Sequence, residues 1–323
     1  MKVMVTGATG FLGKAAALRL HALGHEVTAL GRNRAIGEAL QGPKFLAVDL
    51  EDATAVANAC RDQDVVIHSG ALSSVWGPYA AFHAANVLGT RHVIEGCLAH
   101  GVGRLLNISS PTIYFDYREK HGVKETDALP TQGVNAYAVT KRLAEVELER
   151  AAPGGLRYVN FRPRGIFGPG DTAILPRIIR ANAEGMVPLI GREDPLLDLT
   201  YVENVVDALI AAMDAPGVEG KTYNLSNGAP VRLWATLASL FEQLGQPMRG
   251  RRMSYHGAMA AATLMELAGR LRGKEPVLTR YTVGVLSRGM TLDISAARQD
   301  LGYEPRVGME DGMAHFVAWW KQQ

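Results

Sequence analysis

Residues 2–13 read KVMVTGATGFLG: a short β run leads directly into three glycines, Gly7, Gly10 and Gly13, and a helical pattern begins as the glycines end. Glycines at this spacing allow a tight turn, a close approach of the backbone to a pyrophosphate, and close packing of helix on strand. The amino terminus of the helix adds free N–H groups and the positive end of its dipole. We therefore expect a dinucleotide to bind this turn through Gly7, Thr9, Gly10, Phe11, Leu12 and Gly13.

Beyond this turn, the first half of the chain alternates short β-branched runs with longer helical patterns. This alternation predicts right-handed βαβ units and a Rossmann-type fold of the α/β class, a doubly wound parallel sheet with helices on both faces. We expect strands at residues 2–6, 26–30, 44–48, 64–68, 104–108, 157–161 and 222–225. We expect helices at residues 11–23, 52–59, 79–100, 136–151 and 200–213.

The composition changes after Phe161, which predicts a second, smaller domain. Residues 164–195 are rich in Gly and Pro, and residues 227–323 read as helix and loop with more Met and Arg. We expect a dinucleotide-binding domain at 1–226, with a substrate-side excursion at 165–197, and a discontinuous α-rich substrate cap at 227–323. Residues 257–267 are alanine-rich and interrupted by Glu266, which favours a helix covering an apolar surface over one that touches a membrane.

The bulk properties exclude several classes of protein. A chain of 323 residues with a net charge of +2 is not expected to bind nucleic acid through a strong field. The two cysteines, Cys60 and Cys97, both fall in helical stretches, which favours a reducing, cytoplasmic location. No run reaches the roughly 18 apolar residues of a membrane span. The histidines lack metal-ligand spacing, so no metal site is expected.

The end of the second strand bears on the choice of cofactor. An Asp or Glu there would bind the ribose hydroxyls of NAD, but this chain has Gly31 followed by Arg32 and Arg34. Two guanidinium groups can pair with a 2′-phosphate, which favours NADP(H), with NAD as the alternative. Asp49, followed by Leu50 after the third strand, is expected near the adenine amino group.

Tyr137 and Lys141 stand four residues apart in a helical stretch, so they share one helix face. A free phenol has a pKa of about 10, and a neighbouring ammonium group is expected to lower the pKa of Tyr137 toward neutrality. Lys141 is also expected to hydrogen-bond the nicotinamide ribose. The pair therefore predicts an acid–base group next to the cofactor.

Ser110 follows the fifth strand, at the carboxyl edge where open α/β sheets bind ligands. Its hydroxyl is expected to hold a substrate oxygen beside Tyr137, with Ser109 and Thr112 as alternatives. Asn86, in the preceding helix, is expected either to anchor a proton path or to serve as a packing amide.

Five segments together resemble an extended short-chain dehydrogenase/reductase: TGATGFLG (6–13), IHSGA (67–71), NVLGT (86–90), SSPTIY (109–114) and YAVTK (137–141). FRPRGIFGPGD (161–171), DLTYVENVVDA (198–208) and YNLSNGAPV (223–231) are similar to the 3β-hydroxysteroid dehydrogenase branch, which includes bacterial 2-alkyl-3-oxoalkanoate reductases. The resemblance implies catalytic roles for Ser110, Tyr137 and Lys141, and places Pro163 and Ile166 beside the nicotinamide. It also implies a homodimer paired through residues 79–100 and 136–151.

These observations favour an NADP-dependent enzyme that interconverts a ketone and a secondary alcohol on a largely apolar small molecule, steroid-like or 3-oxoalkanoate-like. The alternative is an NAD-dependent sugar-nucleotide epimerase, for which Arg177, Arg180, Arg251 and Arg252 would clamp a pyrophosphate. A non-catalytic dinucleotide sensor would have no use for the Tyr137 and Lys141 pair. Pro111 and Thr112 after Ser110 replace the Asp-Glu pair of the dehydratases, which argues against dehydration.

Overall fold

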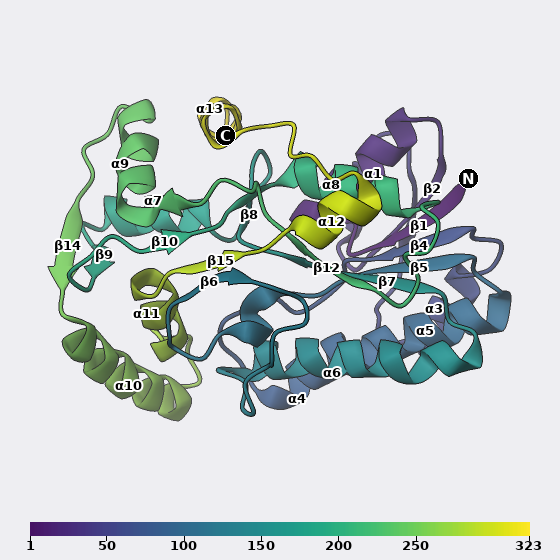
Figure 1. Ribbon diagram of the computed structural model, residues 1–323, viewed down its shortest axis with the longest axis horizontal. Helices are drawn as coiled ribbons and strands as arrows, with labels where there is room; N and C mark the ends of the chain where they lie inside the picture. The colour runs from purple at the N-terminus through teal and green to yellow at the C-terminus, as the bar shows by residue number, and fades with distance from the viewer.

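A parallel seven-stranded sheet forms the centre of the computed structural model, which describes residues 1–323 (Figure 1). The strands lie in the order β12-β7-β5-β4-β1-β2-β3, and the doubly wound arrangement expected from the sequence is confirmed. Strand order reverses between β1 and β4, which creates the crevice where such sheets bind ligands. The strands are β1 (Lys2–Thr6), β2 (Glu26–Gly31), β3 (Lys44–Ala47), β4 (Val65–His68), β5 (Arg104–Ile108), β7 (Tyr158–Pro163) and β12 (Thr222–Leu225).

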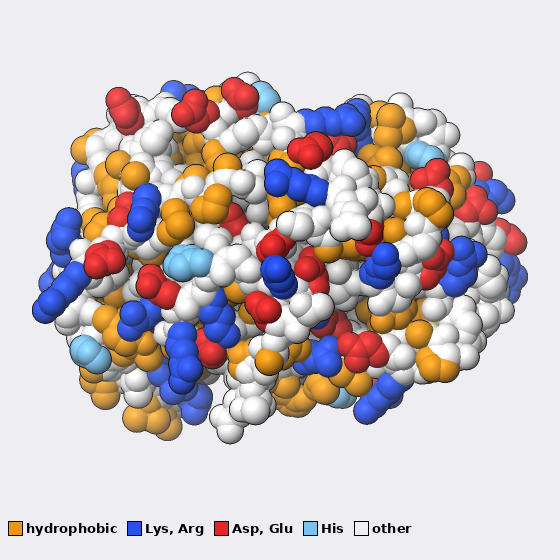
Figure 2. All heavy atoms as spheres, viewed as in Figure 1, with side chains coloured by type: hydrophobic (Ala, Val, Ile, Leu, Met, Phe, Trp, Pro, Cys, Tyr) orange, Lys and Arg blue, Asp and Glu red, His pale blue; other side chains and the backbone are white.

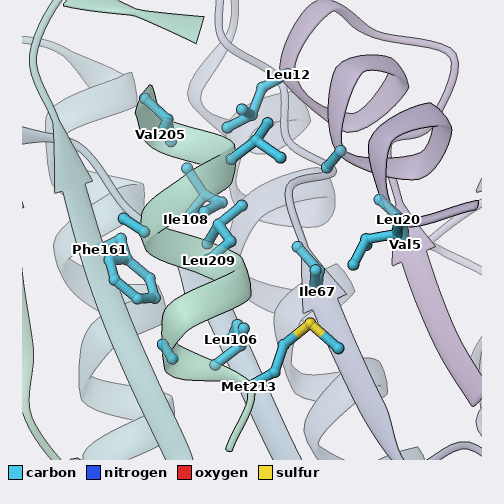
Figure 3. Packing of buried hydrophobic residues seen from close by; sticks show 14 of the residues in the cluster. Val5, Leu12, Leu20, Ile67, Leu106, Ile108, Phe161, Val205, Leu209 and Met213 are labelled. Carbon is cyan, nitrogen blue, oxygen red and sulfur yellow. The ribbon is translucent and has the colours of Figure 1, made fainter. Parts of the chain in front are cut away.

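Helices cover both faces of this sheet because its strands are apolar on both faces. Val5 and Ile67 point to one face, where α1 (Phe11–Ala22) and α8 (Val202–Ala212) pack, and Figure 3 shows Leu209 of α8 among them. Met4 and Val66 point to the other face. That second face is covered by α3 (Ala53–Ala59), α5 (Gly89–His100) and α6 (Ala136–Ala151). This two-sided burial is what the continuous apolar runs of parallel strands predict.

Some elements differ from the sequence expectation. The helix expected at 79–100 is divided into α4 (Tyr79–Phe82), a π-helical turn η1 (His83–Leu88) and α5. A short helix, α2 (Arg34–Glu38), was missed, and the helix expected at 200–213 begins with a two-residue strand, β11 (Thr200–Tyr201), that pairs with β8 (Ile166–Phe167). Short 3₁₀ turns occur at η2 (Pro111–Tyr114) and η3 (Ala152–Gly154).

Two separate pieces of chain meet beside the sheet, on the left of Figure 1. From the first piece, β9 (Val187–Ile190) pairs with β14 (Gly250–Met253), and β10 (Leu196–Leu197) pairs with β13 (Val231–Arg232) and β15 (Met290–Leu292). Residues beyond 227 were expected to lack strands, so these three strands are a correction. An unexpected strand, β6 (Lys120–Val123), joins the same sheet by pairing with β15.

Helices complete this second region, although one helix of the expected cap belongs elsewhere. α7 (Leu175–Ala183), α9 (Leu233–Gln243) and α13 (Met309–Trp320) share one apolar cluster, while α10 (Tyr255–Arg272) and α11 (Arg280–Ser287) share another. By contrast, α12 (Ser295–Leu301) packs into the core of the main sheet through Ala297 and Leu301. The assignment of that segment to the cap is therefore corrected. None of the helices is both long and apolar enough to cross a membrane.

Candidate active site

The three glycines of the first turn have different structural roles. Gly7 has a φ of +68°, and a Cβ there would lie 2.7 Å from Gly70 Cα. A Cβ on Gly13 would lie 2.3 Å from the Gly7 carbonyl oxygen, so Gly13 allows α1 to pack against the turn. Gly10 is exposed, and a Cβ there would meet only that same oxygen, at 3.2 Å. Gly7 and Gly13 therefore close the turn, and Gly10 keeps the start of α1 open.

The start of α1 has the features of a phosphate cradle. Gly10 is its N-cap, no side chain accepts a hydrogen bond from the first turn, and no acidic residue lies in that turn. Without a capping side chain, the N–H groups of the first turn stay free to bind an anion. Leu12 is buried in the core, so it faces this cradle through its backbone only. The residues present fit the diphosphate of a dinucleotide.

The residues expected at the adenosine end lie together at the ends of β2 and β3. A Cβ on Gly31 would lie 2.7 Å from the Thr9 side chain, so no larger residue fits there without displacing Thr9. Arg32 forms an ion pair with Asp49 at 3.7 Å, with side chains 70% and 46% exposed. Arg34 is exposed at the start of α2, and the Leu50 carbonyl oxygen accepts a hydrogen bond from His92.

At the other end of the crevice, Ser110 and Tyr137 are brought together from β5 and α6. The Ser110 hydroxyl donates to Thr112 Oγ1 (2.9 Å). Burial raises the pKa of Tyr137 to about 12, and a side-chain hydrogen-bond interaction with Ser110 opposes that rise. Of the three hydroxyl residues considered, Ser110 is thus the one that neighbours the phenol. Thr112 instead approaches the Tyr281 hydroxyl at 3.3 Å.

Lys141 does not lower the pKa of Tyr137, which corrects the sequence expectation. Its Nζ donates to the Ile108 carbonyl oxygen (2.7 Å) at the end of β5. Burial lowers the pKa of Lys141 to about 8, and the charge of Glu145 opposes this. Sequence spacing placed the two side chains on one helix face, but the lysine is held by the strand below.

A buried ion pair that sequence reasoning missed lies under these residues. Arg162 Nη2 and Glu145 Oε2 are 2.6 Å apart, with side chains only 6% and 3% exposed. Arg162 Nε donates to Glu145 Oε1 (2.8 Å), Asn160 donates to the same oxygen (3.0 Å), and the pKa of Glu145 is lowered despite burial. Glu145 stands four residues after Lys141 on the inner face of α6, and that spacing was the available signal.

A second buried network crosses from the central strand to α6. His68 Nδ1 accepts from Thr6 Oγ1 (2.8 Å), and His68 Nε2 donates to Thr90 Oγ1 (3.0 Å), which in turn donates to the Asn86 carbonyl oxygen (2.6 Å). Burial lowers the pKa of His68 to about 3, so the ring stays neutral. Asn86 Nδ2 donates to the Leu72 carbonyl oxygen (3.1 Å) and to Thr140 (3.1 Å). Asn86 thus acts as a packing amide between the loop after β4 and α6.

The remaining expected residues lie farther along the chain. Pro163 ends β7 and Ile166 begins β8, so both follow the carboxyl edge of the sheet. Tyr281, on α11, was not anticipated, because nothing in the sequence links it to Thr112 across 169 positions. Met290, in β15, is fully buried in a separate apolar cluster that includes Phe115.

Comparison with known proteins supplies a family and several relatives. Residues 3–226 match the model of the NAD dependent epimerase/dehydratase family. The chain is 36% identical to a 2-alkyl-3-oxoalkanoate reductase of Stenotrophomonas maltophilia, over 98% of this chain and 99% of that protein. It is 33% identical to 3beta-hydroxysteroid-dehydrogenase/decarboxylase isoform 1 of Arabidopsis thaliana, over 91% of this chain and 70% of that protein.

Among solved structures, MoeE5 in complex with UDP-glucose and NAD matches with a TM-score of 0.79. The two chains are 26% identical, and the match covers 100% of this chain and 99% of that one. The parallel sheet and its flanking helices are therefore shared with a protein that holds NAD.

Proposed function

The chain belongs to the NAD dependent epimerase/dehydratase family and is a dehydrogenase/reductase of the extended short-chain type. From that premise we propose that it reduces a ketone on a largely apolar substrate to a secondary alcohol, using NADPH. The observation that carries the proposal is the placement of the Tyr137 phenol beside Ser110, at the end of β5, with Lys141 four residues farther along α6. A phenol that stays protonated at neutral pH can donate a proton, as ketone reduction requires.

The residues divide the chemistry between them. The bound nicotinamide supplies the hydride. Ser110 donates a hydrogen bond to the carbonyl oxygen and orients it toward Tyr137, which transfers its proton as negative charge develops there. Lys141 has a pKa of about 8, so it is mostly charged at neutral pH, and it would hydrogen-bond the ribose of the bound nicotinamide. Its bond to the Ile108 carbonyl oxygen fixes the position of that charge.

The preference for NADPH rests on the ends of β2 and β3. Gly31 offers no carboxylate to repel a 2′-phosphate, and its contact with Thr9 leaves no room for one. Arg32 is held only by an exposed pair with Asp49, and such pairs contribute about 0–1 kcal/mol. A phosphate dianion can therefore recruit Arg32, with Arg34 beside it.

The substrate class follows from the relatives and from the reaction. One relative is named a 2-alkyl-3-oxoalkanoate reductase, which supports a ketone β to a carboxylate on an alkyl chain. The test is kcat/KM with NADPH along 3-oxo compounds of increasing chain length. Each buried methylene contributes about 0.8 kcal/mol, so kcat/KM should rise severalfold per carbon. A flat series would contradict an apolar pocket.

A sugar-nucleotide epimerase is the second candidate, favoured by the likeness to MoeE5. Of the arginines expected to clamp a pyrophosphate, Arg177 forms an exposed pair with Glu275 (3.4 Å), and Arg252 lies over the Trp234 ring (5.3 Å); neither contact prevents phosphate binding. The relatives named as a reductase and a dehydrogenase support ketone reduction over epimerisation. Epimerisation of a sugar nucleotide without net cofactor turnover, together with no ketone reduction, would establish the epimerase activity.

We also propose a homodimer, in which α4, η1, α5 and α6 pair with their symmetry mates as a four-helix bundle. The alanine-rich stretches of these helices would permit close approach. Light scattering should give about twice the 34.8 kDa of one chain, and a particle of 34.8 kDa at micromolar concentration would exclude the dimer.

A further inference from the structure

The longest helix of the second region, α10, presents an apolar stripe to solvent. Leu264, Leu267 and Leu271 are 68%, 57% and 82% exposed, and their spacing puts them on one helix face. The opposite face is buried through Ala258, Ala262, Glu266 and Gly269. Val277, just beyond the helix, is also 82% exposed. Single exposed leucines are ordinary, but a continuous stripe indicates a contact surface.

The charges around the stripe are basic. At about 100° per residue, Arg270 and Arg272 lie about 100° to either side of the leucines, and Lys274 follows the helix. Nearby carboxylates are engaged: Glu266 pairs with Arg280 (3.0 Å), and Glu275 pairs with Arg177 (3.4 Å). Arginines in the last turn of a helix interact favourably with the helix dipole. The dipole does not explain why exposed leucines lie between these arginines. Figure 2 shows hydrophobic and basic atoms together at the lower left, where α10 lies in Figure 1.

This end of α10 adjoins the candidate active site. The guanidinium of Arg270 lies 6.0 Å from the ring centre of Trp76, in the loop that follows β4. The segment after α10 leads into α11, whose Tyr281 hydroxyl is 3.3 Å from Thr112 Oγ1, beside Ser110. The helix that follows α10 in the chain thus brings Tyr281 to the candidate active site.

The inner face of α10 covers an apolar cluster, as the sequence predicts, but contrary to that prediction we propose that its outward face docks on the surface of an anionic phospholipid bilayer. Leu264, Leu267, Leu271 and Val277 would enter the boundary between headgroups and acyl chains, and Arg270, Arg272 and Lys274 would lie at phosphate level. An apolar stripe flanked by long cationic side chains suits this interface, because the alkyl stems remain in the apolar layer while the charges reach the phosphates. Docking would bring the active site close to apolar ketones dissolved in the bilayer. That consequence rests on the proposed function, whereas the docking itself does not.

A second copy of the chain fits this face less well. A two-fold contact along α10 would bring Arg270 and Arg272 of one copy toward the same arginines of the other, with no free carboxylate on the helix between them. Anionic phosphates supply the missing complement. Basic residues near an anionic membrane each strengthen binding roughly fivefold.

The experiment is co-sedimentation of the purified full chain with vesicles of phosphatidylcholine alone and of phosphatidylcholine with phosphatidylglycerol. We expect binding to the anionic vesicles, much weaker binding to the neutral ones, and loss of binding at high salt. Leu267→Ser with Leu271→Ser should weaken binding at least tenfold. Arg270→Ser with Arg272→Ser should weaken it roughly 25-fold on anionic vesicles only.

Leu23→Ser and Arg306→Ser, which change exposed residues on other elements, are the matched controls and should bind like the wild type. All variants alter exposed side chains, so their thermal unfolding midpoints should stay unchanged. No binding to anionic vesicles would overturn the proposal. So would equal binding by the leucine double variant, or a drop in particle mass in that variant, which would assign the stripe to a contact between copies. Co-sedimentation does not depend on catalytic activity. The binding result can therefore be interpreted even if the chain proves not to catalyse the proposed reaction.

Discussion

The two ends of the crevice are built in different ways. At the phosphate end, a continuous run from Lys2 to Gly13 forms the strand, the turn and the open helix terminus, and the main chain makes the site. At the reaction end, Ser110, Tyr137 and Tyr281 come from three distant segments, and buried side chains hold them in place. A site made by main-chain groups depends on the conformation of the backbone. A site made by side chains depends on the packing and charge of the residues beneath those side chains.

This difference predicts where substitutions will act. At the phosphate end, most side-chain changes should alter affinity modestly, because the contacts belong to N–H groups. At the reaction end, removing one oxygen or one charge should alter rate or stability strongly. The predictions below test that contrast, from the largest expected effect to the smallest.

Tyr137→Phe removes only the phenolic oxygen that carries the proton. We expect turnover to fall by about 10² to 10⁴, while NADPH affinity stays within twofold of wild type, because general acid catalysis is lost and the phosphate end is untouched. Steady-state kinetics and fluorescence titration of the cofactor measure the two quantities. Tyr79→Phe, an exposed phenol, is the control. A Tyr137→Phe enzyme within threefold of wild type would contradict the assignment.

Glu145→Gln leaves Arg162 buried without its counter-charge. Breaking a buried pair from one side costs about 3–5 kcal/mol, so the free energy of unfolding in urea should fall by that amount. The control is Glu149→Gln on the same helix, whose carboxylate is half exposed and should contribute about 0–1 kcal/mol. Equal losses of unfolding free energy in the two variants would mean that the buried pair stabilises the fold no more than the exposed pair does.

His68 makes the reaction end sensitive to acid. Its pKa is about 3 in the folded chain and 6.5 in the unfolded chain, so the unfolded state binds the proton first. The stability from neutral His68 is fully present above pH 6.5 and is lost as pH falls toward 3, with about 3 kcal/mol of it lost by pH 4. Urea unfolding between pH 7 and 4 should show a flatter pH dependence for His68→Gln. An identical slope in both proteins would rule out this group as the cause.

Arg32→Ala should have the smallest effect, confined to the cofactor. Loss of one charge-assisted contact with a 2′-phosphate weakens NADPH binding by about 1.5 kcal/mol, roughly tenfold, and leaves NADH binding unchanged. Titration of both nucleotides with Arg32→Ala and with Arg34→Ala shows which guanidinium takes part. An unchanged preference in both variants would remove the claim for NADPH.

The sequence predicted the strand, the glycine turn and the helix start of the proposed phosphate end, because its signal is local. Three glycines at fixed spacing after a strand specify both the turn and the helix start, and the βαβ rhythm specified the parallel sheet. Tyr137 and Lys141 were found because helix periodicity places them on one face. The direction of the shift in the pKa of Tyr137 was not predicted correctly, because burial raises that pKa and Lys141 bonds to Ile108.

By itself, the sequence determined the fold class and the glycine turn after β1, and it selected Tyr137 and Lys141 as the proposed acid–base pair, since each depends on residues close together along the chain. Only the tertiary structure decided the pairing of Glu145 with Arg162, the neutral state of His68, the place of Tyr281 and the return of α12 to the sheet. The physical reason is that burial and long-range hydrogen bonding set the charge and position of these groups. Both arise only when segments far apart in the chain are packed together.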